Sequence, residues 1–217
     1  MLEAYLSAVF QTWAEARTRK NWRGFWRLKK LGIHWQLKHA QKIGTEIELT
    51  GPVIIQNSGT IEIGNQVILD SKWYKPIYIQ LARSEAKLTI ENNVYINFGT
   101  EISLVREVFI GAYSLIGNDC LIYDTDWHSL DGLDQDVPVA PTRIGRGVWL
   151  GARVIVMKGV VIGDNTVVAA NSVVTKDLPN NVLAGGSPAS VIPTIERSRY
   201  NPSSIPPTLQ EPYQSDG

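Results

Sequence analysis

Residues 144–184 read IGRGVWLGARVIVMKGVVIGDNTVVAANSVVTKDLPNNVLA and repeat with a period of six. Aliphatic residues fill the first position of every repeat: Ile144, Leu150, Val156, Ile162, Val168 and Val174. Small or β-branched residues mostly fill the fifth position: Val148, Val154, Val160, Thr166, Ser172 and Leu178. An α-helix repeats every 3.6 residues and a flat strand every 2, so neither explains this period. The stretch therefore predicts a chain that turns a corner after each repeat.

A coil with three short flat sides fits this period. The first residue of each side would point inward, and the small residue near the corner would also pack inside. Gly145, Gly151 and Gly163 directly follow aliphatic positions, and we expect Gly, Asn or Asp to accept the positive φ that a corner needs. This pattern is the hexapeptide form of a parallel β-helix, so the predicted fold class is all-β.

The same period extends upstream, with two-residue shifts of frame. The aliphatic first positions there are Ile43, Leu49, Ile55, Ile63, Leu69, Ile90, Ile96, Ile102, Ile110, Ile116 and Ile122. Two segments interrupt it: residues 73–87, interpreted as a loop from one corner, and the polar excursion DTDWHSLDGLDQDVPVAPTR at residues 124–143. Three six-residue sides make one coil, which predicts roughly six coils.

Three parts are predicted along the chain: a basic helical segment at 1–42, the β-helix at 43–192 and a Pro/Ser-rich tail at 193–217. The first part carries four Trp among many Lys and Arg. Such a segment can lie on a membrane surface as an amphipathic helix, or it can pack on the β-helix or on a neighbouring subunit. Both interpretations stay open. The tail is expected to bury little surface.

Composition narrows the classes of function. Cys120 is the sole cysteine, which excludes an internal disulfide framework and a Cys-rich zinc site and predicts a packed thiol. We recognise no signal peptide and no apolar run of about 20 residues, so the protein is interpreted as cytoplasmic. The formal net charge is zero, and we expect no nucleic-acid partner.

His128 is the candidate catalytic residue. His34 and His39 lie in the basic segment, whereas His128 lies in the polar excursion, and loops on rigid scaffolds often carry catalytic groups. An imidazole can accept a proton near neutral pH, and Asp124 or Asp126 could orient it. The alternative is a surface histidine without a catalytic role.

The closing run IGDNTVVAANSVVTKDLPNNVLAGGSPASVI, residues 162–192, carries a VVTKD segment and a later Gly-x-Pro-Ala. In these features, residues 90–192 resemble the left-handed β-helix acyltransferases, the family that includes galactoside, maltose, serine, xenobiotic and polysaccharide O-acetyltransferases. The resemblance implies a left-handed coil, a homotrimer with clefts between subunits, and transfer of an acetyl group from acetyl-CoA to a hydroxyl without a metal.

The resemblance also implies roles for individual residues. His128 would deprotonate the acceptor hydroxyl, and Asn97 of the Asn97-Phe98 pair would face it and contact the acceptor. The backbone N–H of Ala152 would polarise the thioester carbonyl. The residues implied to bind acetyl-CoA are Trp149, Ala152, Ala170, Thr175 and Lys176.

One departure from the family pattern concerns the CoA phosphates. Ser190 and Pro193 stand where the family commonly has basic residues, so Arg197 or Arg199 would have to supply the phosphate contact. We expect the acceptor to be a sugar hydroxyl in an exopolysaccharide or lipopolysaccharide precursor. The alternatives are a xenobiotic or serine acetyltransferase, a β-helix carbonic anhydrase with three histidines around zinc, and a non-catalytic scaffold.

Overall fold

The computed structural model describes residues 32, 36–38, 40–129 and 136–193. The chain divides into two units, Met1–Lys38 and His39–Gly217, and the second contains the strands described below. Most of the predicted helical segment and all but Pro193 of the predicted tail lie outside the described residues. Within these residues, no helix has the length and apolar character needed to cross a bilayer.

The second unit is built from three sheets, here named A, B and C. Sheet A contains β1 (Lys42–Ile43), β4 (Thr60–Ile63), β7 (Lys87–Ile90), β10 (Glu107–Ile110), β13 (Thr142–Ile144) and β16 (Val161–Ile162). Sheet B contains β2 (Glu48–Leu49), β5 (Ile68–Asp70), β8 (Tyr95–Asn97), β11 (Leu115–Ile116), β14 (Trp149–Leu150), β17 (Val167–Val168), β19 (Leu183–Gly186) and β20 (Ala189–Val191). Sheet C contains β3 (Val53–Asn57), β6 (Ile77–Leu81), β9 (Glu101–Leu104), β12 (Leu121–Tyr123), β15 (Ile155–Val156) and β18 (Val173–Val174).

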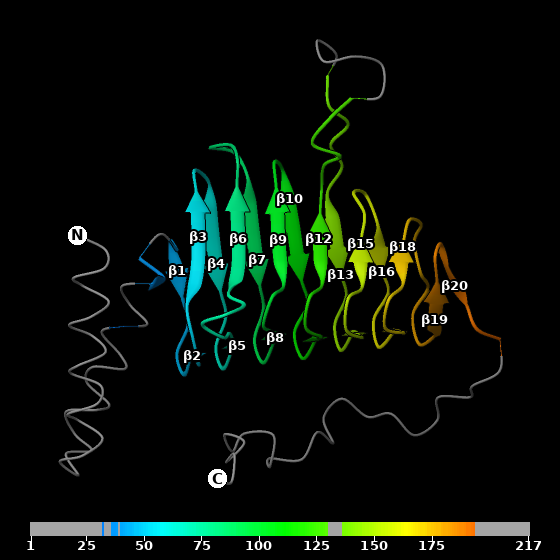
Figure 1. The fold of residues 1–217 in the computed structure, drawn as a ribbon, viewed down its shortest axis with the longest axis horizontal. Helices are drawn as coiled ribbons and strands as arrows, with labels where there is room; N and C mark the ends of the chain where they lie inside the picture. The colour runs from blue at the N-terminus through cyan, green and yellow to red at the C-terminus, as the bar shows by residue number, and fades with distance from the viewer. Residues whose placement is uncertain (1–31, 33–35, 39, 130–135, 194–217) are drawn as a thin grey trace, which may run out of the picture. The chain divides into compact units, whose positions relative to one another are not determined.

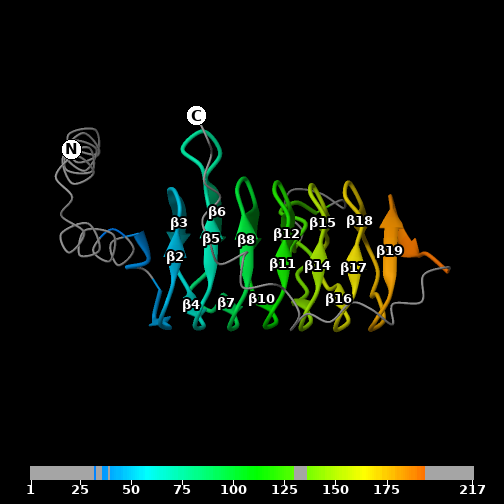
Figure 2. The same ribbon diagram turned by 90° about the horizontal axis from the view of Figure 1, so that it is seen from below.

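From β1 to β18, consecutive strands belong to different sheets, and each strand from β1 to β15 pairs in parallel with the strand three places later, as β8 does with β11. At the C-terminal end, β19 pairs in parallel with β17 and antiparallel with β20. The chain therefore winds as a triangular coil, and β1 to β18 make the six coils that the period predicts. In Figure 1 the chain rises along sheet C, passes behind to sheet A and returns below through sheet B while advancing toward the C-terminal coils. Figure 2 shows the same winding from the side of sheet B. This winding is left-handed, as the resemblance implies.

The core is the inside of the triangle. The six first-position residues of the 144–184 stretch are all 0% exposed, and successive coils stack them in register, as with Ile116, Leu150 and Val168 in sheet B. Each fully buried aliphatic side chain contributes about 1.5–3 kcal/mol relative to an exposed one. The hexad pattern is thus a record of which residues face inward.

The glycines of the hexads correct one expectation. Positive φ falls on the fourth position of the repeat, for example at Gly147 and Arg153, and not on the second position. Gly151 occupies a second position for another reason: a Cβ there would lie 2.6 Å from the amide nitrogen of Ala170 in the next coil. These glycines allow close stacking of the coils.

The interruption predicted at residues 73–87 is wrong in part, because β6 crosses it. In β6, inward Ile77, Ile79 and Leu81 alternate with outward residues, which is the two-residue period of a strand. The chain leaves the coil only on either side of β6, at residues 71–76 and 82–86. The excursion after β12 is confirmed, and it is the largest projection from the coils in Figure 1.

Cys120 is buried, as predicted, and its thiol donates a hydrogen bond to the Gly151 carbonyl at 3.2 Å. Burial raises the pKa of the thiol to about 11. At neutral pH the side chain is therefore a protonated packing group, because the thiolate is the reactive form.

Candidate active site

Asp124 fixes the root of the loop that carries His128. Its side chain is fully buried, and its carboxylate accepts hydrogen bonds from the backbone amides of Val105 at 2.8 Å, Arg106 at 2.6 Å and Glu107 at 2.7 Å. Hydrogen bonds to an ionised acceptor are stronger than neutral ones. Asp124 was predicted as an orienting partner for the imidazole, but the hydrogen bonds of its carboxylate that are described here all come from the preceding coil.

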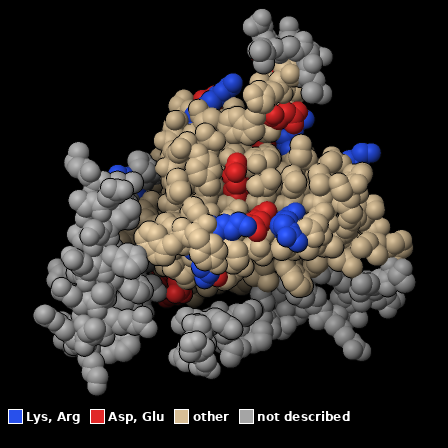
Figure 3. Space-filling model, viewed as in Figure 1, with Lys and Arg blue, Asp and Glu red and all other residues tan. Residues whose placement is uncertain are grey.

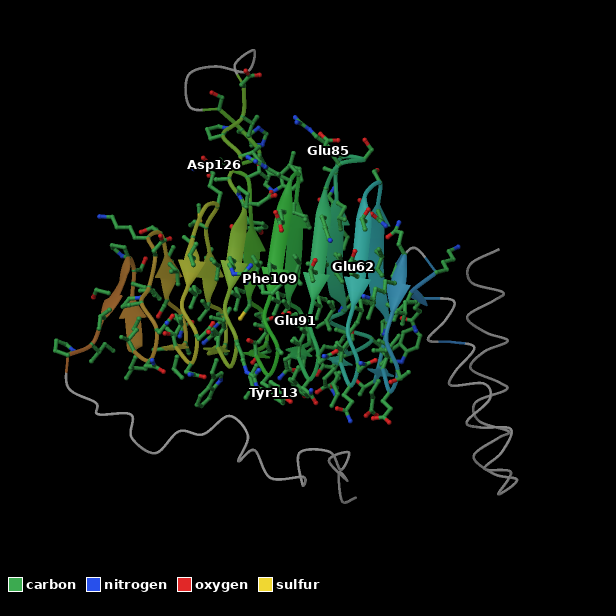
Figure 4. All side chains as sticks on the ribbon, turned by 180° about the vertical axis from the view of Figure 1, so that it is seen from behind. Glu62, Glu85, Glu91, Phe109, Tyr113 and Asp126 are labelled. Carbon is green, nitrogen blue, oxygen red and sulfur yellow. The ribbon has the colours of Figure 1, made fainter. Side chains whose placement is uncertain are left out.

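The next residues form a short stem. Thr125 pairs with Val139 in an antiparallel bridge, and the Ala140 amide donates to the Asp124 carbonyl at 2.9 Å. The Asp126 carboxylate forms an ion pair with the Lys158 ammonium at 2.8 Å. Figure 4 shows Asp126 where the loop leaves the coils, and in Figure 3 acidic and basic side chains meet there. The stem therefore holds both strands of the excursion against the β-helix.

Trp127 has an unusual backbone conformation directly before His128. Its φ is +61°, and its amide donates to the Thr125 hydroxyl at 3.2 Å. Most other non-glycine residues with positive φ occupy the fourth position of a hexad, for example Asn93, Tyr113 and Asn171, and Trp127 does not. A bulky residue in this region costs about 1–3 kcal/mol and persists only where its surroundings enforce it. The stem thus imposes the direction in which the exposed His128 leaves the coil.

The other predicted residues lie on the outer surface of sheet B and at two corners of the triangle. Asn97 ends β8 and Trp149 begins β14, both on the outer surface of sheet B, where Trp149 is 45% exposed. Ala152 and Ala170 lie at the corner between sheets B and C, one coil apart. The exposed Thr175 and Lys176 follow β18 at the corner between sheets C and A.

His128 lies at that second corner, opposite sheet B in the same coil. Figure 1 shows its loop on the side away from the edge that carries β2, β5 and β8. One chain therefore places His128 near the corner of Thr175 and Lys176 and on the far side from Asn97 and Trp149.

The two corners that border sheet B differ in whether side chains accept hydrogen bonds from their backbone amides. At the A–B corner, stacked side chains cap the amides: Asp164 Oδ1 accepts the Arg146 amide at 2.8 Å, and Asn180 Oδ1 accepts the Asp164 amide at 2.8 Å. At the B–C corner, Ala170 occupies the place equivalent to Asp164 and has no acceptor for the Ala152 amide. Among the described residues, no hydrogen bond uses that amide as a donor.

A polar cluster beside Asn97 was missed by the sequence reasoning. Asp70 accepts hydrogen bonds from the Thr50 hydroxyl at 2.6 Å, the Tyr95 hydroxyl at 2.7 Å and the Lys72 ammonium at 2.9 Å. Asp70 is also the register partner of Asn97. The sequence did contain a signal for this cluster. Asp70 directly follows the inward Leu69, just as Asn97 directly follows the inward Ile96, so the two polar residues occupy the same position of their repeats.

The environment of the Asp70 carboxylate shifts two pKa values. Partial burial by itself raises the pKa of Asp70, but the three hydrogen bonds and the charge of Lys72 outweigh it and lower the pKa below its ordinary value. Burial and the neighbouring Asp70 carboxylate raise the pKa of Tyr95 well above its ordinary value. The pair is therefore a carboxylate accepting from a protonated phenol at neutral pH.

In the described part of the chain, no three His, Cys, Asp or Glu residues are grouped so that they could hold a metal ion. The zinc alternative needs three histidines, and two of the chain's histidines, His34 and His39, lie outside the described residues. Arg197 and Arg199, the candidate contacts to the CoA phosphates, lie outside them as well.

Comparison with known proteins begins with the repeat itself. Residues 141–176 match the family model described as "Bacterial transferase hexapeptide (six repeats)". The chain carries the hexapeptide repeat of bacterial transferases. This match confirms the predicted resemblance to hexapeptide-repeat acyltransferases and covers β13 to β18, the part of the coil that contains Trp149, Ala152, Ala170, Thr175 and Lys176.

Individual acetyltransferases are similar over a larger part of the chain. The galactoside O-acetyltransferase of Escherichia coli strain K12 is 35% identical over 129 residues, which are 58% of this chain and 62% of that protein. The same organism's "Putative colanic acid biosynthesis acetyltransferase WcaF" is 37% identical over 106 residues, 49% of this chain and 58% of that protein. This chain thus spans less than two thirds of either relative.

Solved structures share the fold at lower identity. A point mutant of AntD, an N-acyltransferase from Bacillus cereus solved with dTDP and coenzyme A, superposes with a TM-score of 0.61 at 21% identity. The superposition covers 76% of this chain and 89% of that one. The likeness is one of fold.

Proposed function

We propose that this chain is an acetyl-CoA-dependent O-acetyltransferase that acts on a sugar hydroxyl in exopolysaccharide or lipopolysaccharide biosynthesis. The observation that carries the proposal is the exposed His128, held on an anchored stem that projects from hexapeptide coils. The names of the galactoside and colanic acid relatives support a sugar as the acceptor. The proposed location is cytoplasmic, with the 1–42 segment as a candidate contact to the inner face of the membrane.

His128 acts as the general base in this proposal. Its imidazole takes the proton of the acceptor hydroxyl as the oxygen attacks the thioester carbon of acetyl-CoA. The C–O bond forms while the carbonyl becomes an oxyanion, and the tetrahedral intermediate then expels the CoA sulfur. The imidazolium returns the proton to that sulfur, so the products are the acetyl ester and CoA. His128 ends the cycle neutral.

The Ala152 amide is the proposed donor to the oxyanion. An amide without an internal partner can donate to charge that develops on the carbonyl oxygen, and a preorganised donor of this kind needs no rearrangement during the reaction. Ala170 supports this role because its methyl group leaves the amide uncapped, unlike the Asn and Asp at the A–B corner. Ala170 would therefore contribute by having no side-chain acceptor, which keeps the Ala152 amide available for the oxyanion.

We propose a homotrimer with sites shared between copies. His128 of one copy would face Asn97, Trp149 and Ala152 of the next, because one chain carries these groups on opposite sides of the triangle. Trp149 would contact the thioester arm of acetyl-CoA, and Ala170, Thr175 and Lys176 its pantetheine and nucleotide. Closed cyclic symmetry repeats such a shared site at each interface.

The test is CoA release by the full-length protein with acetyl-CoA and a panel of acceptors. The panel contains nucleotide sugars, lipid-linked sugars, serine and chloramphenicol. The proposal expects release with one or more sugars. Release with serine or chloramphenicol alone would replace it with the amino-acid or xenobiotic alternative, and no release with any acceptor would favour a non-catalytic scaffold, for which the non-basic Ser190 and Pro193 are the supporting observation.

A further inference from the structure

Residues 72–75 form a tight turn between β5 and β6 that presents two aromatic side chains. Lys72 and Lys75 pair across it, with the Lys75 amide donating to the Lys72 carbonyl at 3.0 Å. At its tip Trp73 is 59% and Tyr74 80% exposed, the largest exposures among the large hydrophobic residues that the structure describes. Turn tips usually carry Gly, Asn, Asp or Pro. We name residues 72–75 the aromatic turn.

Ion pairs fasten both ends of the aromatic turn to the coils. Lys72 bonds to Asp70 at 2.9 Å, and the Lys75 ammonium lies 2.6 Å from the Asp119 carboxylate. The Gly99 amide also donates to the Lys75 carbonyl at 3.2 Å. Such anchoring lowers the conformational entropy that a ligand would otherwise have to remove. In Figure 2 the turn rises beyond its neighbours between β5 and β6.

The aromatic turn lies beside the candidate acceptor residue. The rings of Tyr74 and Phe98 have centroids 6.4 Å apart and meet at 57°, which is a favourable tilted contact between aromatic rings. Phe98 directly follows Asn97, whose Oδ1 accepts the Phe98 amide at 2.9 Å. That bond uses one lone pair of Oδ1 and orients the side chain, whose amino group carries two protons that can be donated to a ligand.

We propose that Trp73 and Tyr74, together with Asn97, form a subsite that binds a pyranose ring of a glycan acceptor. A pyranose has an apolar face of C–H groups and a rim of hydroxyls. The aromatic rings would cover the apolar face, and Asn97 would bond to the rim. The inference rests on the proposed function in one respect: the ring bound here belongs to the molecule that is acetylated.

Charge and size favour a sugar over other occupants. The two lysines of the aromatic turn are each paired with a carboxylate, so the turn does not present the unpaired cations that phosphate binding uses. Two aromatic side chains are also far less surface than a stable protein–protein interface of about 1,200–2,000 Å² requires. A single amphipathic sugar ring, a few ångströms across, matches the size and the uncharged character of the surface that Trp73 and Tyr74 present.

The kinetic test uses Trp73→Ala and Tyr74→Ala with the acceptor found in the CoA-release panel. The acceptor KM is expected to rise about tenfold in each variant, as for truncation of an aromatic binding residue, with the acetyl-CoA KM unchanged. Trp73→Phe and Tyr74→Phe keep an aromatic ring and should stay within about threefold of the parent. Ile54→Ala removes a 44% exposed apolar side chain from sheet C and serves as the matched control.

A binding test separates this subsite from the proposed function. Saturation-transfer NMR would use the parent protein without acetyl-CoA and trisaccharides of glucose, galactose or mannose. The subsite is supported if the parent protein saturates the ring C–H protons of a trisaccharide and both alanine variants fail to do so. This result would support the subsite even if the parent transfers no acetyl group. Acetyl transfer to a sugar with an unchanged KM in both variants overturns the subsite and leaves the proposed function standing. Loss of the oligomer in the alanine variants with saturation unchanged also overturns it, because the turn would then be a contact between copies.

Discussion

The buried carboxylate of Asp124 accepts the amide hydrogen of Arg106 at 2.6 Å. This bond, with the two beside it from Val105 and Glu107, joins the loop of His128 to the preceding coil. An aspartate that sequence reasoning places beside the imidazole thus acts on the backbone of another coil. Its effect on catalysis would be exerted through the position of the loop.

Asp124→Asn is expected to destabilise the protein by about 1–3 kcal/mol, because the new amino group cannot accept an amide hydrogen and leaves buried donors unsatisfied. Urea unfolding measures this change. Asp126→Asn is the matched control, since its ion pair with Lys158 is partly exposed and is worth about 1 kcal/mol or less. Equal stability of the Asp124 variant and the parent would contradict the anchoring role.

His128→Ala is expected to lower the rate of acetyl transfer by about 10²–10⁴, the contribution of a positioned general base. The folded state and oligomer should be preserved because His128 is exposed. Single-turnover CoA release and sedimentation measure the two properties. Ser129→Ala, in the same loop, is the control for disturbance of the backbone. Turnover at the parent rate in His128→Ala would remove the general-base assignment.

Mixing two inactive variants tests whether copies share a site. His128→Ala and Asn97→Ala protomers that are unfolded together and refolded at equal amounts should regain about a quarter of the parent activity, because random assembly pairs the intact His128 of one copy with the intact Asn97 of its neighbour at that frequency. Each variant refolded alone provides the baseline. No gain over that baseline would show that both residues act within one chain.

Ala170→Asn should cap the Ala152 amide as Asp164 caps Arg146 in the other corner. Loss of one oxyanion donor reduces kcat by about 10²–10³, with little change in the acceptor KM. Asn180→Ala is the converse control: it uncaps the Asp164 amide, should cost stability and should leave kcat unchanged. A fully active Ala170→Asn variant would exclude the Ala152 amide from the reaction.

The lowered pKa of Asp70 predicts a pH dependence of stability. A group whose pKa is lower in the folded state stabilises the fold above its unfolded value, near 3.8, and this contribution disappears as the pH falls through the folded value. Asp70→Asn should therefore be less stable than the parent at pH 7, and the difference should shrink toward pH 2. Urea unfolding at both pH values measures it. A difference that grows in acid would reverse the sign of the shift.

The hexad frame could be predicted from the sequence because each inward residue is an aliphatic residue at a fixed interval. For Ile144 and Leu150, for example, the residue type and its position in the repeat are enough to predict that the side chain is buried. The strand β6 could not be found in this way: residues 71–76 add a loop just before it, so its inward Ile77 falls out of the six-residue frame. Period-two alternation inside the interruption was the signal that remained.

The candidate site was predicted less completely than the fold. Sequence identifies residue types, and so His128 and Asn97 could be named, but the partner of a carboxylate depends on three-dimensional packing. Asp124 and Arg106 are separated by 17 intervening residues, and only the stacking of consecutive coils brings them together. The uncapped amide of Ala152 was equally hidden, because it depends on which side chain lies one coil away.

The register of the stacked coils also limits how this architecture can change in length. Each wall recurs after three sides, so the loss or gain of one side would rotate every later strand onto the wrong wall and remove Val168 from beneath Leu150. Growth or shortening must therefore proceed by whole turns of the spiral. Irregular insertions can be accommodated at the vertices, and both the imidazole-bearing loop and the aromatic turn are found there.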